Sequence, residues 1–137
     1  MNATDKNIEL APRIHFLTGW QTIQHGSIKQ GGTLTIDYDP WRLPNSRRES
    51  RDAIFWRIEA FVRFHPGGQL YTGSVLEAIH GTGPVRDHRP KPFQVEVPKD
   101  ATQVEVWFRS GLEELGYYGG TWDSRYGQNY WFDIVHA

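Results

Sequence analysis

The sequence predicts an all-β protein: a single-domain, antiparallel β-sandwich of the immunoglobulin-like kind with about eight strands. The first observation is that apolar and polar residues alternate in several short segments, which is the period of a half-buried strand. The second is that 14 Gly and 8 Pro are spread along the chain and interrupt these segments. The third is a length of 137 residues without a long apolar pattern of helical spacing, which fits one domain with its own core.

Two parts of the chain are expected. Residues 1–12 are predicted to form a flexible N-terminal arm, and residues 13–137 the β-sandwich domain. Within the domain, strands are expected in chain order at residues 14–17, 20–23, 33–39, 56–65, 70–79, 93–97, 104–109 and 130–135.

The segment at residues 33–39 has the clearest strand pattern. Leu34, Ile36 and Tyr38 alternate with polar residues until Pro40 ends the run. The next segment is polar, and we expect a loop there whose basic residues face solvent: Arg42, Arg47, Arg48 and Arg51.

Residues 56–65 alternate and are rich in β-branched and aromatic side chains, which favours a strand. Some apolar residues lie three and four apart, so a helix stays open as an alternative. The sequence His65-Pro66-Gly67-Gly68 predicts a hairpin turn, from which the chain returns over 70–79. Residues 80–92 and 111–120 contain many Gly, Pro or charged residues and are expected to be loops.

The composition excludes several classes of function. A formal net charge of −1 argues against a nucleic-acid-binding protein, which needs a positive face for phosphates. The chain has no cysteine, so disulfides, thiolate nucleophiles and cysteine zinc sites are excluded. No apolar run approaches the ~18 residues of a membrane span, and the N-terminus has no apolar signal core. We therefore expect a soluble cytoplasmic protein, with secretion by another route left open.

No motif for catalysis or for a cofactor stands out. The G-x-S-x-G, Walker and dinucleotide patterns are missing, so we expect a protein that is not an enzyme and has no cofactor. The histidines lack metal-ligand spacing, and no metal site is predicted. Two alternatives stay open: a metal cluster of Glu77, His80, Asp87 and His88, and calcium bound by Asp123 with loop carbonyls.

The candidate binding site is the segment T-W-D-S-R-Y-G-Q-N-Y-W-F-D-I at residues 121–134. It places aromatic rings beside amides, hydroxyls and carboxylates on an expected loop. Sugar recognition needs both kinds of group, because rigid rings cover the C–H faces of a sugar while planar polar groups bind its hydroxyl edges. The segment therefore predicts a carbohydrate site, in which we include Trp122, Ser124, Tyr126 and Asn129. Tyr118, in an upstream aromatic loop, and Trp41, in the polar loop, are further candidate platforms.

The motif W-D-S-R-Y-G-Q-N-Y at residues 122–130 resembles the W-D-N-N-N-G-x-N-Y motif of carbohydrate-binding module family 21. These starch- and glycogen-binding modules also occur in glycogen-targeting subunits of protein phosphatase 1. The preceding F-Q-V-E-V-P and V-E-V-W-F-R-S-G segments are similar in order to the family's last strands, so the resemblance covers residues 93–134. The matching positions are Trp122, Asp123, Gly127, Asn129 and Tyr130.

The resemblance implies a non-catalytic module that binds a polysaccharide or oligosaccharide, with an α-glucan as the ligand class of the family. It implies that Trp122 stacks on a sugar ring and that Asn129 binds sugar hydroxyls. Ser124, Arg125 and Tyr126 replace the family's three consecutive Asn residues, so the match is partial at the positions that contact sugar.

Two other interpretations remain. In a purely structural one, Asp123 and Asn129 hydrogen-bond the loop backbone, Gly127 supplies a positive φ, and Trp122 and Tyr130 are core rings. In the second, the protein is an interaction or structural module, and the aromatic surface contacts a protein partner or a second copy in a homodimer.

Overall fold

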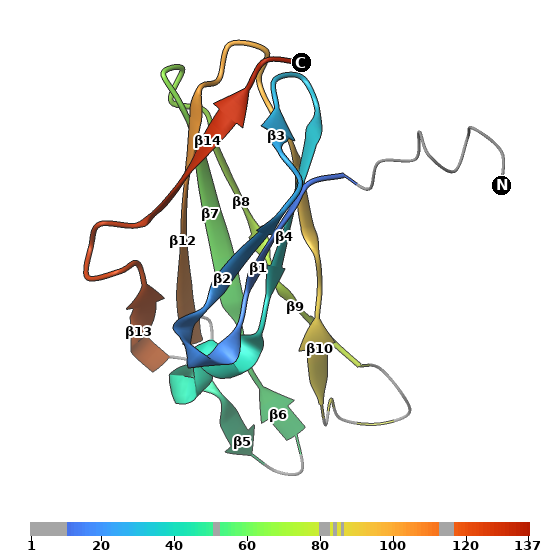
Figure 1. Cartoon of the computed structure of the whole chain (residues 1–137). Coiled ribbons are helices and arrows are strands. Elements are labelled where there is room, and N and C mark those ends of the chain that lie inside the picture. Colours follow the sequence, from blue (N-terminus) through green and yellow to red (C-terminus); the bar gives the residue numbers. More distant parts are fainter. Residues whose placement is uncertain (1–10, 51–52, 80–82, 84, 86, 113–116) are drawn as a thin grey trace, which may run out of the picture.

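The computed structural model describes residues 11–50, 53–79, 83, 85, 87–112 and 117–137; for residues 46, 50, 112 and 117–119 the description covers the backbone alone. These residues form an all-β sandwich, as predicted (Figure 1). Most of the expected arm, residues 1–10, lies outside the described part. No helix within that part is long and apolar enough to cross a membrane.

Two larger sheets make the sandwich. One has the strand order β11-β4-β1-β2, and the other has the order β3-β14-β12-β7-β8 with β13 also paired to β12. The first sheet contains β1 (Arg13–Phe16), β2 (Thr22–His25), β4 (Thr33–Tyr38) and β11 (Phe93–Glu96). The second contains β3 (Ile28–Lys29), β7 (Ile58–His65), β8 (Leu70–Ser74), β12 (Gln103–Leu112), β13 (Tyr117–Asp123) and β14 (Tyr130–Val135).

Short elements extend this framework. Two ribbons pair β5 (Arg48–Ser50) with β6 (Ala53–Phe55), and β9 (Leu76–Ala78) with β10 (His88–Pro90). Three 3-10 turns complete the described part: η1 (Thr18–Trp20), η2 (Pro40–Arg42) and η3 (Pro44–Ser46). The described residues thus form more strands than the sequence predicts, because several are fragments too short to show alternation. Pairing is mainly antiparallel, but β1 runs parallel to β4 and β14 parallel to β3.

The core lies between the two sheets. Along β7 the side chains of Ile58, Ala60, Val62 and Phe64 are fully buried, and the residues between them are partly exposed. This alternation confirms the predicted strand and shows that the helical alternative for residues 56–65 is wrong, because only a strand places every second residue in the core. The hairpin turn after His65 is also confirmed, since Phe64 donates to the Gln69 carbonyl at 2.9 Å and β8 returns along β7.

The expected loop at residues 111–120 is wrong at both ends. β12 continues to Leu112 and β13 already begins at Tyr117, and the two strands pair. A Cβ at Gly120 would collide with the carbonyl oxygen of Ser110, so glycine permits this close approach of the strands. The glycines that suggested a loop therefore belong in part to a strand.

The register of β12 explains why the motif segment protrudes. Phe108 of β12 lies opposite Asp123 at the end of β13, and Val106 lies opposite Tyr130 at the start of β14. Both strands pair with the same edge of β12, so the whole turn at residues 124–129 has only Trp107 opposite it. The extra chain has no room within the sheet and projects outward, as Figure 1 shows between β13 and β14.

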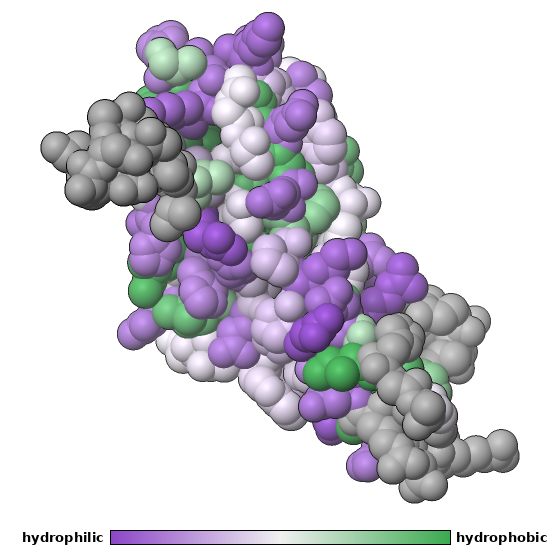
Figure 2. All heavy atoms as spheres, turned by 90° about the vertical axis from the view of Figure 1, so that its right-hand side faces the viewer, coloured by the Kyte–Doolittle hydropathy of each residue, from purple (hydrophilic) through white to green (hydrophobic). Residues whose placement is uncertain are grey.

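The face turned to the viewer in Figure 2 mixes hydrophilic and apolar residues, and its apolar spots are small and separate. Broad apolar patches mark interaction surfaces. This face therefore offers no wide apolar area of the kind that marks an interaction surface.

Candidate functional site

A groove of about 540 Å³ lies beside the projecting turn. Its walls carry three exposed rings: Trp20 from η1 is 63% exposed, Trp122 from β13 is 54% exposed, and Tyr126 at the tip of the turn has no cover. Aromatic and polar groups thus face the same space. The lining residues are Trp20, Trp122, Asp123, Ser124, Arg125, Tyr126, Gln128 and Tyr130.

Beneath the groove, a buried ion pair joins Arg42 to Asp123. Both side chains are at most 1% exposed, and Arg42 Nε donates to Asp123 Oδ2 at 2.9 Å. The hydroxyl of Tyr38 donates to the same oxygen at 2.7 Å, and that of Tyr130 donates to Oδ1 at 2.5 Å. The Asp123 carboxylate is therefore saturated by side chains distant in sequence. It neither bonds the loop backbone nor is available to calcium.

Arg42 contradicts the expectation that the whole basic cluster faces solvent. Its Nη1 donates to the carbonyls of Leu17 and Gln21 at 3.0 and 3.2 Å, and its Nη2 donates to the Tyr130 hydroxyl at 2.8 Å. Burial disfavours the charge, but the hydrogen bond and charge of Asp123 outweigh it and raise the pKa of Arg42. A local pattern of charges could not reveal this partner on another strand.

The buried guanidinium also supports a ring of the groove. Its carbon lies 4.7 Å from the ring centre of Trp20 and 5.4 Å from that of Phe16. A cation at this distance is attracted to the ring face. The cation–π contact with Arg42 thus helps to position the Trp20 ring, although most of the surface of Trp20 is exposed.

Tyr130 connects the ion pair to the surface. It is half-buried, packs edge-to-face on Phe16 at 5.1 Å, and lines the groove. Burial and the hydrogen bond to Asp123 raise its pKa to about 12, and burial beside Asp123 raises the pKa of Tyr38 still further. The structural interpretation, in which Tyr130 is a core ring, is partly confirmed. The Tyr130 ring packs on the core, and its hydroxyl hydrogen-bonds both Arg42 and Asp123.

The turn at residues 124–129 is closed by its own hydrogen bonds. Ser124 accepts from the Gly127 amide through Oγ at 3.1 Å and from the Asn129 amide through its carbonyl at 2.6 Å. Gly127 has a φ of 86°, as the structural interpretation predicts. Arg125, Tyr126 and Asn129 also have positive φ, with values of 48°, 58° and 62°.

Positive φ in residues other than glycine is concentrated at this site. Among the described residues, Trp20 with a φ of 64° is the remaining example, and it lines the same groove. Such backbone conformations are sparsely populated and persist where the surrounding structure imposes them. Three of the residues that line the groove, Trp20, Arg125 and Tyr126, therefore have a backbone held in an unfavourable conformation.

Asn129 lies outside this groove. Its side-chain amide donates to Glu105 Oε2 at 2.6 Å, and Glu105 also accepts from His65 at 2.9 Å. Burial alone would raise the pKa of Glu105, but the hydrogen bonds of Asn129 and His65 outweigh it and lower the pKa. The residue to which the resemblance assigns sugar contact is thus partly engaged in fixing the turn to β12.

A second groove of about 390 Å³ continues the first. It shares Trp20, Arg125 and Tyr130 with the first groove and extends to Trp131, which is 45% exposed. Trp131 stacks on His65 at 4.9 Å, and its indole nitrogen donates to the Gln128 carbonyl at 2.9 Å. The other residues that line this second groove are Thr22, Gln24 and Phe132.

The predicted site residues are only partly brought together. Trp122, Ser124 and Tyr126 line the first groove. Trp41, which is 56% exposed, belongs instead to a separate cluster, where its ring meets Trp56 at 4.9 Å and Arg47 at 5.5 Å. The backbone of Tyr118 lies in β13, but its side chain is outside the described residues.

Sequence reasoning missed several lining residues, chiefly Trp20, Arg125, Gln128 and Trp131. Arg125, Gln128 and Trp131 stand in the motif segment, so their proximity to Trp122 was a usable signal. Trp20 was placed in an expected strand; the Gly19-Trp20 pair, with φ values of 79° and 64°, turns the chain there instead.

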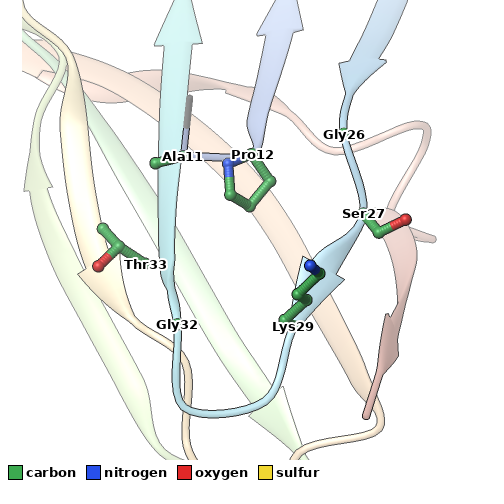
Figure 3. Close-up of a pocket in the computed structure, with 7 residues that line it drawn as sticks. All are labelled: Ala11, Pro12, Gly26, Ser27, Lys29, Gly32 and Thr33. Atoms are coloured by element: carbon green, nitrogen blue, oxygen red, sulfur yellow. The ribbon is translucent and has the colours of Figure 1, made fainter. Parts of the chain in front are cut away.

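A third hollow, also of about 390 Å³, lies near the turn between β3 and β4 (Figure 3). None of the described residues that line it is aromatic: they are Ala11, Pro12, Gly26, Ser27, Lys29, Gly32 and Thr33. No group of three or more His, Asp or Glu suited to a metal ion occurs within the described ranges; His80, part of the open metal alternative, falls outside them.

Comparison with known proteins identifies a family. Residues 4–135 match the model of a protein family described as a family of unknown function, DUF6209. Neither the curated proteins nor the solved structures give a match.

Proposed function

The chain belongs to DUF6209, whose function is unknown, and we propose from its site that it is a non-catalytic carbohydrate-binding module. The groove beside the projecting turn is the binding site. The observation that carries the proposal is the convergence of exposed rings with hydroxyl, amide and guanidinium groups on one groove of about 540 Å³.

The exposed rings supply the apolar part of recognition. Trp122 and Tyr126 come from the motif segment and Trp20 from η1, so the groove has rings on more than one element. Rigid rings provide contact area at a low cost in side-chain entropy, since they have only two χ angles. This suits a sugar, whose faces are apolar and whose individual hydrogen bonds contribute little.

Polar groups line the same groove as the rings. Gln128 has an amide that both donates and accepts, and Arg125 donates from a planar group. The Ser124 hydroxyl already accepts from Gly127, so its proton is its contribution to a ligand. An α-glucan, which the resemblance to family 21 modules implies, is the first ligand to test.

Affinity gel electrophoresis with glycogen, amylopectin and unrelated glucans tests the proposal. The wild-type protein is expected to be retarded, and Trp122→Ala to weaken retardation about tenfold or more, as loss of a central aromatic anchor does. Trp41→Ala is the matched control, because Trp41 and Trp122 are almost equally exposed, at 56% and 54%. Retardation that survives Trp122→Ala, or none with any glycan, would contradict the proposal.

The second candidate function is a protein-interaction module. The observation in its favour is that the outer face of β7, β12 and β13 continues the ring surface: Phe61 stacks on Trp107 at 5.5 Å and lies 5.9 Å from Trp122. Loss of self-association or of partner binding in Trp122→Ala, without any glycan retardation, would favour this function.

A further inference from the structure

The two grooves beside the turn are continuous, and their shared residues identify what a bound chain would meet at the centre. Trp20, Arg125 and Tyr130 line both grooves. Trp122 and Tyr126 lie at one end, and Trp131 at the other. Exposed rings at both ends with a charged group between them form one cleft, which combines two grooves of about 540 and 390 Å³.

Arg125 is the unpaired charge of this cleft. It is exposed, and its guanidinium makes no hydrogen bond or ion pair with any described residue. Arg109, which lies 5.5 Å from the ring centre of Trp122, lines neither groove and is not counted in the charge of the cleft. Arg42 adds no net charge, because Asp123 neutralises it.

Within the part of the chain that the structure describes, no acidic side chain lining either groove offsets the charge of Arg125. Asp123 is the single acid among the described residues that line either groove, and it is 2% exposed and saturated by Arg42, Tyr38 and Tyr130. Glu105, attached to the turn through Asn129, is 8% exposed and also faces His65 and Arg63. The cleft is therefore cationic although the whole chain has a formal net charge of −1.

The backbone holds this arginine in an unusual place. Arg125 has a φ of 48° in a turn that Ser124 closes, and the next residue, Tyr126, has a φ of 58°. A solvated surface arginine needs no such conformation. Here the left-handed turn directs successive side chains along the cleft at a cost in local stability.

We propose that the cleft binds an acidic saccharide chain, in which Arg125 binds the carboxylate or sulfate group of one sugar unit while exposed rings stack on neighbouring units. This inference rests on the proposed carbohydrate function and specifies its ligand. The planar guanidinium presents paired donors that match two oxygens of a carboxylate or sulfate group. An uncharged α-glucan would leave this donor pair without a charged partner.

The test measures binding of four polymers by affinity electrophoresis and titration calorimetry. Polygalacturonate and its methyl-esterified form share a backbone and differ in charge, as do dextran sulfate and dextran. The wild-type protein is expected to bind at least one acidic polymer about tenfold more tightly than its uncharged counterpart. Added salt is expected to weaken that binding, because screening acts on the exposed charge.

Arg125→Gln is the decisive variant, since glutamine keeps a Cβ at the positive φ and removes only the cation. It is expected to weaken binding of the acidic polymer about tenfold and to weaken binding of the uncharged polymers much less, because they lose one neutral hydrogen bond and no charge pair. Arg89→Gln is the matched control: it makes the same change in charge at an exposed arginine outside both grooves, paired with Glu77 at 2.7 Å. Arg125→Lys keeps the charge without the planar donor pair and is expected to bind with intermediate strength.

The outcomes separate the inference of an acidic ligand from the proposed carbohydrate-binding function. Tighter binding of polygalacturonate identifies the carboxylate, and tighter binding of dextran sulfate alone identifies the sulfate; either supports the inference when Arg125→Gln removes the preference. Equal binding of charged and uncharged polymers that depends on Trp122 overturns the inference and leaves the carbohydrate function standing. Absence of binding to every polymer, glycogen included, overturns both.

Discussion

At the scale of single residues, the site depends on the pairing of Asp123 with Arg42. Asp123 is a matching position of the motif, yet its carboxylate faces the interior and holds Arg42, Tyr38 and Tyr130. Through these contacts it fixes the end of β13 to η2 and β4. The residue therefore shapes the groove from below, and the rings above it are free to meet a ligand.

Replacing Asp123 is expected to destabilise the fold strongly. Asp123→Ala leaves the buried Arg42 cation unpaired and is expected to lower the free energy of unfolding by about 3–5 kcal/mol. Asp37→Ala is the control, because it breaks the more exposed pair with Arg13 at 2.6 Å and is expected to cost about 1 kcal/mol or less. Urea denaturation measures both.

Should Asp123→Ala not fold, the double variant Arg42→Met with Asp123→Leu provides the same test. It removes both charges and is expected to be more stable than Asp123→Ala, although the hydroxyls of Tyr38 and Tyr130 still lose their acceptor. Equal losses in Asp123→Ala and Asp37→Ala would show that the buried pair has no special weight.

Tyr130 makes stability depend on alkaline pH. Its pKa rises from 10.0 to about 12 in the folded protein, so folding favours the protonated phenol. The stabilisation is complete below the unfolded pKa and is lost as pH rises from about 10 through 12. Tyr130→Phe is expected to be less stable at neutral pH and to lose less stability over this interval, as followed by urea denaturation at stepped pH.

Tyr130→Phe is expected to remove only part of the stability loss at alkaline pH, because burial beside Asp123 also raises the pKa of Tyr38. Tyr126→Phe is the control, since that side chain lies in solvent and bonds no buried group. An identical alkaline loss in Tyr130→Phe and the wild type would contradict the role of Tyr130.

At the scale of elements, the turn between β13 and β14 is the distinctive feature. Both strands pair with one edge of β12, and the turn leaves the sheet opposite Trp107. Ser124 and Gly127 close it, and Asn129 attaches it to Glu105. Its shape is thus fixed by hydrogen bonds, while Tyr126 at its tip contributes no packing to the fold.

Tyr126→Gly separates folding from binding in this turn. Glycine relieves the positive φ of 58°, and its greater freedom in the unfolded chain opposes that gain. Stability in urea is therefore expected to change by less than about 1 kcal/mol, while retardation on the glycan gel falls. A large loss of stability would show instead that the Tyr126 ring supports the fold.

At the scale of the whole molecule, the exposed tryptophans fall into two groups. Trp20, Trp122 and Trp131 surround the continuous cleft, whereas Trp41 packs on Trp56 in a separate cluster. Because the cleft rings lie in grooves and on a projecting turn, they form a concave surface suited to a chain ligand.

The carbohydrate proposal predicts a monomer. Stable homodimers bury about 800 Å² per partner on complementary surfaces, whereas a cleft that receives a glycan must stay open to solvent. Sedimentation equilibrium is expected to give the mass of one chain, 15.9 kDa, at all concentrations tested. A dimer that dissociates in Trp122→Ala would instead support the interaction module.

Much of the framework could be predicted from the sequence because its signals are local. The alternation in residues 33–39 and 130–135 and the hairpin turn after His65 all reappear in the structure as β4, β14 and the β7–β8 turn. The short strands β5 and β10 could not be found in this way, since three residues are too few to show a period. The aromatic and polar content of the motif segment likewise indicated where exposed rings would gather.

The sequence by itself determined the fold class and the place of the projecting rings, because strand period and turn residues act within one segment. Only the tertiary structure decided which side chains form the site. Arg42 and Asp123 are 81 positions apart, so no local pattern joins them, and a basic residue in a polar segment looks solvated until its partner is in place. Burial and charge pairing depend on which strands become neighbours, and this is why Asn129 was assigned to the ligand and Arg42 to solvent, while the structure places both in supporting contacts.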